Sequence, residues 1–160
     1  MSDAGRPVRR RRYVTLLREM SHHIDNGREF RTVRRLIGIY DADSTVRGEV
    51  TYWIGARLGR AHCALCDITH GLVRERGDWK RLKAKLPVPF ATFHRDDRPA
   101  EITAAVGDVA PVVVADTATG AVLLLGPREL EACATSPQRL ITAIQGALDA
   151  AGLIWPPSRE

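Results

Sequence analysis

Two cysteines and two histidines carry the residue types and the spacing that chemistry needs. His62 stands directly before Cys63, Cys66 follows three residues after Cys63, and His70 follows four residues after Cys66. If a helix begins at Cys63, then Cys63, Cys66 and His70 fall at positions i, i+3 and i+7 and share one face. This cluster can support thiol–disulfide exchange or the binding of a metal ion, and the two need different surroundings.

Thiol–disulfide exchange needs a thiolate, which a helix N-terminus or a nearby imidazolium favours by lowering the cysteine pKa from about 8.5. Cys63 would have both influences, because a helix is predicted to start there and His62 is its neighbour. Cys66, one turn later, would be the resolving thiol that closes the disulfide. The sequence therefore predicts a redox site whose substrate is a protein disulfide or thiol, and this interpretation calls for no cofactor.

Two other interpretations of the cysteine pair stay open. Cys63, Cys66 and His70 could be three ligands of a zinc ion, with His94 as the fourth ligand or with a water completing a hydrolytic site. Alternatively, both cysteines are small buried apolar side chains without chemistry. Cys133 stands alone beside a short predicted helix and is expected to be buried and structural.

Positive charge is concentrated at the N-terminus. The formal net charge is +5, but residues 1–35 hold ten arginines and four acidic residues, a net charge of +6, which leaves −1 for the rest. We expect residues 1–34 to be a basic arm, disordered or loosely docked, which could bind nucleic acid or another acidic partner. That gives a third hypothesis, a non-enzymatic interaction module.

Export and membrane insertion are not expected from the sequence. The arginine run at 9–12 is followed by a stretch broken by charged residues, so an export signal with its apolar region is not predicted. The longest apolar runs are too short to cross a bilayer. We therefore expect a cytoplasmic protein with no membrane partner.

Length and hydropathy pattern indicate one α/β domain. The chain has 160 residues, 44% of them hydrophobic, which suits a single domain over 35–153 with an irregular tail over 154–160. The periodicity predicts strands and helices in the order strand, helices, strand, helix, strand, strand, helix. The predicted strands lie at 36–40, within 88–97, at 112–115 and at 122–125, and the predicted helices lie at 44–58, from 63, from 78, at 100–106, from 127 and at 137–151.

Paired aspartates follow the first two predicted strands. Asp41 and Asp43 come after the first strand, and Asp96 and Asp97 come after the second, close to His94. Turn and capping roles are the simplest interpretation for both pairs. No P-loop, dinucleotide-binding glycine pattern or nucleophile-elbow motif is present in the sequence, which disfavours those three classes of enzyme.

The chain resembles the thioredoxin-like fold over about residues 35–150. The order of elements, the Cys-x-x-Cys at 63–66 between the first two strands, and Pro111 directly before the predicted hairpin carry the resemblance. It implies a small mixed sheet with helices on both faces, and a cis Pro111 that faces the dithiol and holds the backbone of the substrate chain. The chain departs from that pattern by an extra helix inserted before the Cys-x-x-Cys.

A second resemblance concerns the residues around the cysteines. The strings YDAD at 40–43 and HCALCDITHG at 62–71 are similar to those of a group of uncharacterised bacterial proteins. This second likeness implies a bacterial source and supplies no activity.

Overall fold

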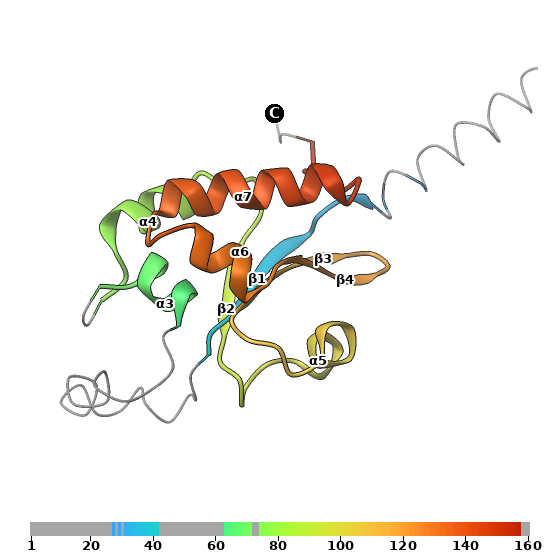
Figure 1. Cartoon of the computed structure of the whole chain (residues 1–160). Helices are drawn as coiled ribbons and strands as arrows, with labels where there is room; N and C mark the ends of the chain where they lie inside the picture. The colour runs from blue at the N-terminus through green and yellow to red at the C-terminus, as the bar shows by residue number, and fades with distance from the viewer. Residues whose placement is uncertain (1–26, 28, 30, 42–62, 72–73, 158–160) are drawn as a thin grey trace, which may run out of the picture.

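The sheet and its helices form a mixed α/β arrangement (Figure 1). The computed structural model describes residues 27, 29, 31–41, 63–71 and 74–157. The helix predicted over 44–58, His62 and most of the basic arm lie outside these residues, so those predictions stay untested. None of the helices in the described ranges is long and apolar enough to cross a membrane.

Four strands build one open sheet within the described part of the chain, in the order β2-β1-β3-β4. The central strand β1 pairs parallel with β2 and antiparallel with β3, and β3 and β4 form an antiparallel hairpin. Both parallel strands therefore end at the same edge of the sheet. The strands are β1 (Arg35–Ile39), β2 (Phe90–Phe93), β3 (Val112–Thr117) and β4 (Gly120–Leu125).

Five helices connect and follow these strands in the described residues, and two of them agree closely with the prediction. The segment 100–106 is helical as predicted, and the last helix has Ser136 as its N-cap and Pro137 at its first position. The Ser136 hydroxyl accepts a hydrogen bond from the Arg139 N–H at 3.3 Å, which satisfies one of the unpaired donors of the first turn. The helices are α3 (Ala64–Thr69), α4 (Gly77–Lys83), α5 (Ala100–Val106), α6 (Pro127–Ala132) and α7 (Pro137–Ala150).

The hairpin strands are longer than predicted. Each extends to the turn, so that only Ala118 and Thr119 separate β3 from β4. The Thr117 hydroxyl accepts from the Thr119 N–H and donates to the Gly120 carbonyl, which closes the turn locally. Gly120 has φ of 122°, a conformation that glycine adopts without steric cost.

The tail beyond α7 lies against the residues that precede β1. Ile154 forms a bridge with Thr32, its N–H donates to the Arg31 carbonyl at 3.0 Å, and its carbonyl accepts from the Val33 N–H at 2.9 Å. The indole N–H of Trp155 donates to the Gln145 side chain on α7 at 2.7 Å. The residues that follow α7 are therefore hydrogen-bonded to the segment that leads into β1.

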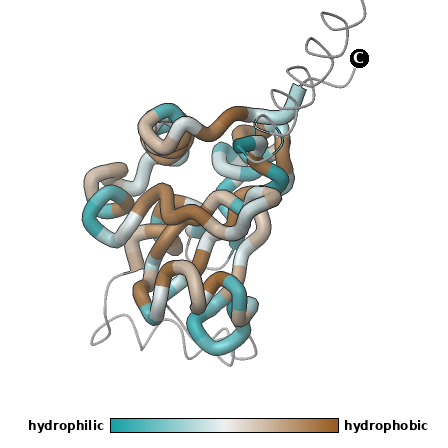
Figure 2. The backbone as a smooth tube through the Cα atoms, turned by 90° about the vertical axis from the view of Figure 1, so that its right-hand side faces the viewer, coloured by the Kyte–Doolittle hydropathy of each residue, from teal (hydrophilic) through white to brown (hydrophobic). Residues whose placement is uncertain are grey.

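The sheet is covered on both faces, and each face has its own apolar cluster. Figure 1 shows α7, α6, α4 and α3 over one face and α5 over the other. Figure 2 shows hydrophobic stretches of the backbone running through the middle of the molecule. Along β1 and the residue that follows it the side chains alternate, with Leu36 and Tyr40 in the larger cluster and Ile37 and Ile39 in the cluster under α5.

Gly38, in the middle of β1, lets helix α3 approach the sheet closely. A Cβ atom at this position would lie 2.9 Å from Cε1 of Phe90 and 3.1 Å from Cδ2 of Leu65. Leu65 is fully buried and directly precedes Cys66 on α3. The absence of a side chain at Gly38 therefore sets how the helix that carries the cysteines packs on the sheet.

Replacing Gly38 with alanine is expected to lower the free energy of unfolding by about 1–3 kcal/mol, the usual cost of forcing an extra methyl group into a packed core. Phe90 cannot move away freely, because its ring packs edge-on against Trp79 with 5.0 Å between centroids. Urea unfolding of the two chains, both with the disulfide formed, measures the difference. Gly146→Ala on α7, where a Cβ meets no atom within 4 Å, is the control and should not destabilise the protein. An equal stability for Gly38→Ala would contradict this account of the packing.

Candidate functional site

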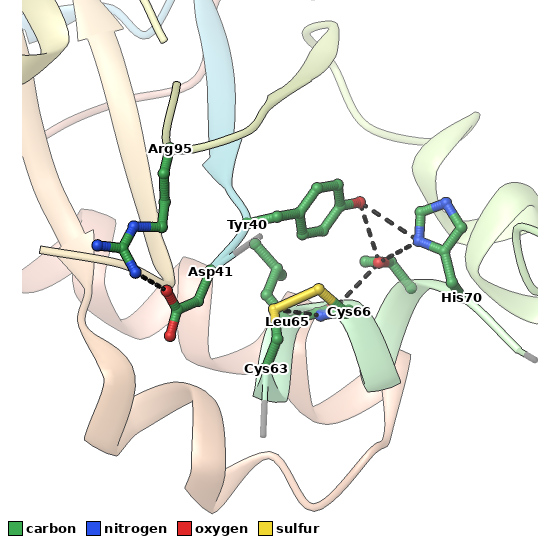
Figure 3. Close-up of a disulfide and its surroundings, with 8 residues drawn as sticks. Tyr40, Asp41, Cys63, Leu65, Cys66, His70 and Arg95 are labelled. Atoms are coloured by element: carbon green, nitrogen blue, oxygen red, sulfur yellow. Dashed lines mark hydrogen bonds and ion pairs between the residues drawn. A yellow bond between two sulfur atoms is a disulfide. The ribbon is translucent and has the colours of Figure 1, made fainter. Parts of the chain in front are cut away.

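The cysteine pair lies at the start of α3, at the edge of the sheet where β1 ends (Figure 3). Cys63 is the N-cap residue, and its Sγ accepts a hydrogen bond from the Cys66 N–H at 3.3 Å. Cys63 and Cys66 form a disulfide, with their Cα atoms 5.3 Å apart. The helix start predicted at Cys63 is confirmed, and the spacing of the pair allows the two sulfur atoms to bond.

Exposure differs between the two cysteines. Cys63 is partly exposed and packs against the edge of the large apolar cluster, whereas Cys66 is 9% exposed and belongs to that cluster. Cys63 is therefore the more accessible of the two cysteines.

Helix α3 is shorter than the predicted helix, which changes the place of His70. The helix ends at Thr69, and His70 is the C-cap in extended conformation, with φ of −122° and ψ of 146°. Its N–H still donates to the Cys66 carbonyl at 2.8 Å, and its backbone pairs with Glu75 across a short turn. His70 therefore does not continue the helical face of Cys63 and Cys66, and its imidazole turns toward Tyr40 and Thr69.

A buried group of hydroxyls joins the end of β1 to the end of α3. The Tyr40 hydroxyl lies 3.0 Å from Thr69 Oγ1 and 3.5 Å from His70 Nδ1. Thr69 Oγ1 lies 2.9 Å from His70 Nδ1 and donates to the Leu65 carbonyl at 2.8 Å. The Tyr40 ring meets the imidazole edge-on, with centroids 5.6 Å apart. The sheet, the disulfide helix and one imidazole are thus linked by polar contacts in a mostly apolar region.

His94 comes directly after β2, and its ring also lies near Tyr40. Its ring centroid is 5.7 Å from that of Tyr40. Its N–H and its Nδ1 both contact the Asp97 carboxylate, the latter at 3.3 Å. Asp97 therefore serves as the turn residue predicted for it, and its side chain also orients the imidazole.

An ion pair lies at the edge of the sheet beside the disulfide. Arg95 Nη1 lies 2.9 Å from Asp41 Oδ1, which joins the ends of the parallel strands β1 and β2. Figure 3 shows this pair on one side of the disulfide and the Tyr40–His70 contact on the other. The arginine side chain is more than half exposed, so the pair adds little to stability and mainly sets the local charge.

Arg76 links the C-terminal end of α3 to α4 and to the turn between α6 and α7. Its guanidinium binds both oxygens of Asp78, at 3.1 and 2.8 Å, and donates to the Thr135 carbonyl at 2.8 Å in the turn between α6 and α7. The backbone N–H of Arg76 donates to the Thr69 carbonyl at 2.9 Å. The helix predicted from 78 begins at Gly77, so Asp78 lies inside its first turn, where it binds Arg76.

The Arg76–Asp78 pair predicts a pH dependence of stability. Hydrogen bonds from the Arg76 side chain, and a weaker one from the Trp79 N–H, hold the pKa of Asp78 below its usual value of 3.8. The stabilisation is therefore complete above this usual pKa, which the unfolded chain retains, and is lost as the pH falls through the lower pKa of the folded protein. We expect the difference in unfolding free energy between the natural chain and Asp78→Asn to be constant near neutrality and to shrink below about pH 4. A difference that persists undiminished below pH 2 would show that the carboxylate charge is not its source.

The zinc site stays a prediction, which the disulfide-bonded form of the cysteine pair does not test. The sulfur atoms of Cys63 and Cys66 are bonded to each other, and the two imidazoles contact Thr69 and Asp97 through Nδ1. No group of three histidine, cysteine or acidic side chains gathers at metal-binding distance in the ranges the structure describes. His62, the remaining predicted site residue beside the pair, lies outside those ranges.

Pro111 is a cis proline directly before β3 and Cys133 is buried, as expected, whereas the expected position of Pro111 facing the dithiol stays a prediction. The Ala110–Pro111 peptide bond is cis and stands directly before β3, with Pro111 buried. Cys133 is buried at the end of α6, where its thiol donates to the Glu129 carbonyl at 3.3 Å. Burial raises the pKa of this thiol, so it is protonated at neutral pH and inert.

Sequence reasoning overlooked two members of the site, Tyr40 and Thr69. Tyr40 looked like the last apolar residue of a buried strand, and Thr69 looked like an ordinary helix position. A signal was present in the string THG at 69–71, since a threonine and histidine before a glycine are typical of a helix end.

No family model, curated protein or solved structure matches the chain.

Proposed function

We propose that the chain catalyses thiol–disulfide exchange through Cys63 and Cys66. The observation that carries the proposal is the disulfide across the first turn of α3, with Cys63 Sγ at the N-cap accepting the Cys66 N–H. In the reduced protein the same N–H and the positive end of the helix stabilise a thiolate at Cys63. Its greater exposure makes Cys63 the attacking sulfur.

The arrangement of the described elements supports this function. The mixed sheet in the order β2-β1-β3-β4, helices on both of its faces, the disulfide helix between β1 and β2 in the chain, and a cis proline before β3 are compatible with the pattern that the resemblance implies. In that pattern Pro111 holds the backbone of the substrate beside the dithiol.

The reaction proceeds in two exchanges of sulfur partners. The Cys63 thiolate attacks one sulfur of a substrate disulfide, forms a mixed disulfide and releases the other substrate sulfur as a thiolate. Cys66 then loses its proton and attacks Cys63 Sγ, which forms the Cys63–Cys66 disulfide and releases the second substrate sulfur. In sum, two protein thiols are oxidised and one substrate disulfide is reduced to two thiols. The partner is a protein disulfide or thiol, and the cytoplasm is the proposed compartment.

A redox titration of the full-length chain tests this function. We expect Cys63 and Cys66 to be oxidised together in one two-electron step in glutathione buffers. The midpoint reduction potential should lie above about −300 mV, because structural disulfides have reduction potentials below that value. Alkylation of the quenched samples counts the thiols, and Cys133→Ser shows that the third cysteine does not contribute. A midpoint below that range would make the disulfide structural. Stoichiometric zinc in the reduced protein, with both thiols protected until chelation, would replace the redox function by a metal site.

A further inference from the structure

Strand β4 forms one edge of the described sheet and has an apolar sequence. Over Gly120–Leu125 it reads Gly-Ala-Val-Leu-Leu-Leu, with no charged residue and no proline. Leu123, in the middle of the strand, is 49% exposed. Natural proteins usually place lysine, proline or a short strand at a sheet edge, because the free backbone groups there can pair with another chain. The edge at β4 is therefore suited to such pairing.

The opposite edge of the sheet, formed by β2, has the protection that β4 lacks. β2 spans only Phe90–Phe93, and Pro87 and Pro89 stand in the segment that leads into it. The charged segment 94–98, His-Arg-Asp-Asp-Arg, follows it directly. A second chain that extends the sheet is thus expected at β4 rather than at β2.

The register of the hairpin shows which backbone groups of β4 bond to β3. The paired residues Thr117 and Gly120 flank the two-residue turn, where an antiparallel pair exchanges both of its hydrogen bonds. Hydrogen-bonded pairs alternate along an antiparallel ladder, so the next such pair is Ala115 with Val122. The ladder is regular from the turn to Leu123, so this alternation holds over the first four residues of β4.

The alternate residues of β4, Ala121 and Leu123, therefore turn their N–H and C=O groups away from β3. Asp116 on β3 shows the same alternation, because its carbonyl accepts from the Arg34 N–H on the β1 side at 2.8 Å. No hydrogen bond within the described part of the chain uses the outward groups of Ala121 and Leu123. These two residues offer two donors and two acceptors along the edge.

We propose that two copies of the chain pair through β4, antiparallel to each other, about a two-fold axis that passes beside Val122. Ala121 of one copy then lies opposite the partner's Leu123, and each such pair exchanges both of its hydrogen bonds. The same groups serve on both copies, so the edge is complementary to itself. The two four-stranded sheets join into one continuous sheet of eight strands. The inference is independent of the exchange function.

The side chains of β4 suit this pairing. Ala121 packs against the cluster under α5, and Leu123, two residues later, lies on the same face of the sheet. The half-exposed Leu123 then lies beside the small side chain of the partner's Ala121, which removes apolar surface from water. Val122 meets the partner's Val122 on the opposite face. Because β4 carries no charge, no like charges on this strand meet at the axis, although each chain has a net charge of +5.

The small size of this contact predicts a weak dimer. One pair of edge strands buries less than the about 1,600 Å² of a standard protein interface. We therefore expect the chain to be a monomer at about 1 μM and mostly a dimer at about 500 μM.

Sedimentation velocity of the full-length chain over this range of concentrations measures the association. The buffer contains a reductant, so that Cys63 cannot link two copies through a disulfide. Leu123→Lys places a charge on the edge, and we expect it to raise the dissociation constant at least about 10-fold. Val109→Lys is the matched control, because Val109 is the other large apolar residue that is exposed, at 46%, and it lies outside β4. It should change the dissociation constant by no more than about twofold.

Amide hydrogen exchange locates the contact within β4 and does not depend on a substitution. The amides of Ala121 and Leu123 should exchange freely in the monomer and at least about 10-fold more slowly at the concentration where the dimer forms. The amide of Val122 bonds to β3 and should be protected equally at both concentrations.

Each contrary result overturns the proposal. A monomer at every concentration would show that β4 does not pair two copies. A dimer that Leu123→Lys leaves intact, or in which the amides of Ala121 and Leu123 still exchange freely, would place the interface elsewhere. Slow exchange of these two amides in a monomer would show that another part of the same chain covers β4.

Discussion

The Cys66→Ser chain is expected to lose all catalytic turnover in disulfide exchange while it keeps the first chemical step. Cys63 remains at the N-cap of α3, so it still attacks a substrate disulfide. The serine hydroxyl, unlike a thiol, does not displace a sulfur at neutral pH, so the mixed disulfide between Cys63 and the substrate accumulates. Turnover should fall by at least about 1,000-fold, the scale on which removal of an essential reacting group acts.

Mass spectrometry of the quenched reaction measures this outcome directly. One substrate thiol should be attached to Cys63 in Cys66→Ser, and none should be attached in Cys63→Ser, whose remaining Cys66 is buried. Cys133→Ser is the control, because its buried thiol takes no part, and it should turn over at the rate of the natural chain. Turnover in Cys66→Ser near that of the natural chain would mean that Cys63 acts with an external thiol and that the pair is not the functional unit.

The elements that the sequence predicts best are those with a strong local pattern. Helix α7 has a serine cap, a proline at the first position and apolar residues at helical spacing, and its bounds agree with the prediction. The strands of the hairpin were recognised from their apolar runs. Their ends were not, because Thr117 and Gly120 form a turn through side-chain and backbone contacts that composition does not specify.

The site was predicted in part, and the missing part depends on contacts between distant residues. The spacing of Cys63 and Cys66 identified the chemistry, since both lie in one turn of helix. The early end of α3 could not be read from periodicity, because Leu72 and Ile68 continue the helical pattern. The helix ends at Thr69, whose carbonyl accepts a hydrogen bond from the backbone N–H of Arg76 in the segment that follows.

The role of Tyr40 shows the same limit. A tyrosine at the end of a buried strand is an ordinary core residue until the neighbours of its hydroxyl are known. Those neighbours are Thr69 and His70, about 30 residues later in the chain, and only the packing of α3 on the sheet brings them together. A polar network in a mostly apolar region is specified by tertiary structure and gives no periodic signal.

Trp79→Ala is expected to lower the free energy of unfolding by about 3–5 kcal/mol, the usual cost of removing a large buried aromatic side chain. Trp79 on α4 is 1% exposed and packs edge-on against Phe90 of β2, the ring that a Cβ atom at position 38 would meet. Removing the indole leaves a cavity between α4 and the sheet. For a single domain this is a large share of a total stability of about 5–15 kcal/mol.

Urea unfolding with the disulfide kept intact measures the loss, and Trp155 supplies the matched control. Trp155→Ala makes the same chemical change at a partly exposed position, where the indole mainly donates to the Gln145 side chain, so it should cost about 1 kcal/mol or less. Because Phe90 and Leu65 both face Gly38, we also expect Trp79→Ala to loosen α3 and to increase alkylation of reduced Cys66. Equal losses of unfolding free energy in the two variants would contradict this account. They would show that Trp79 does not hold α4 against the sheet and does not act through Phe90 on the disulfide helix α3.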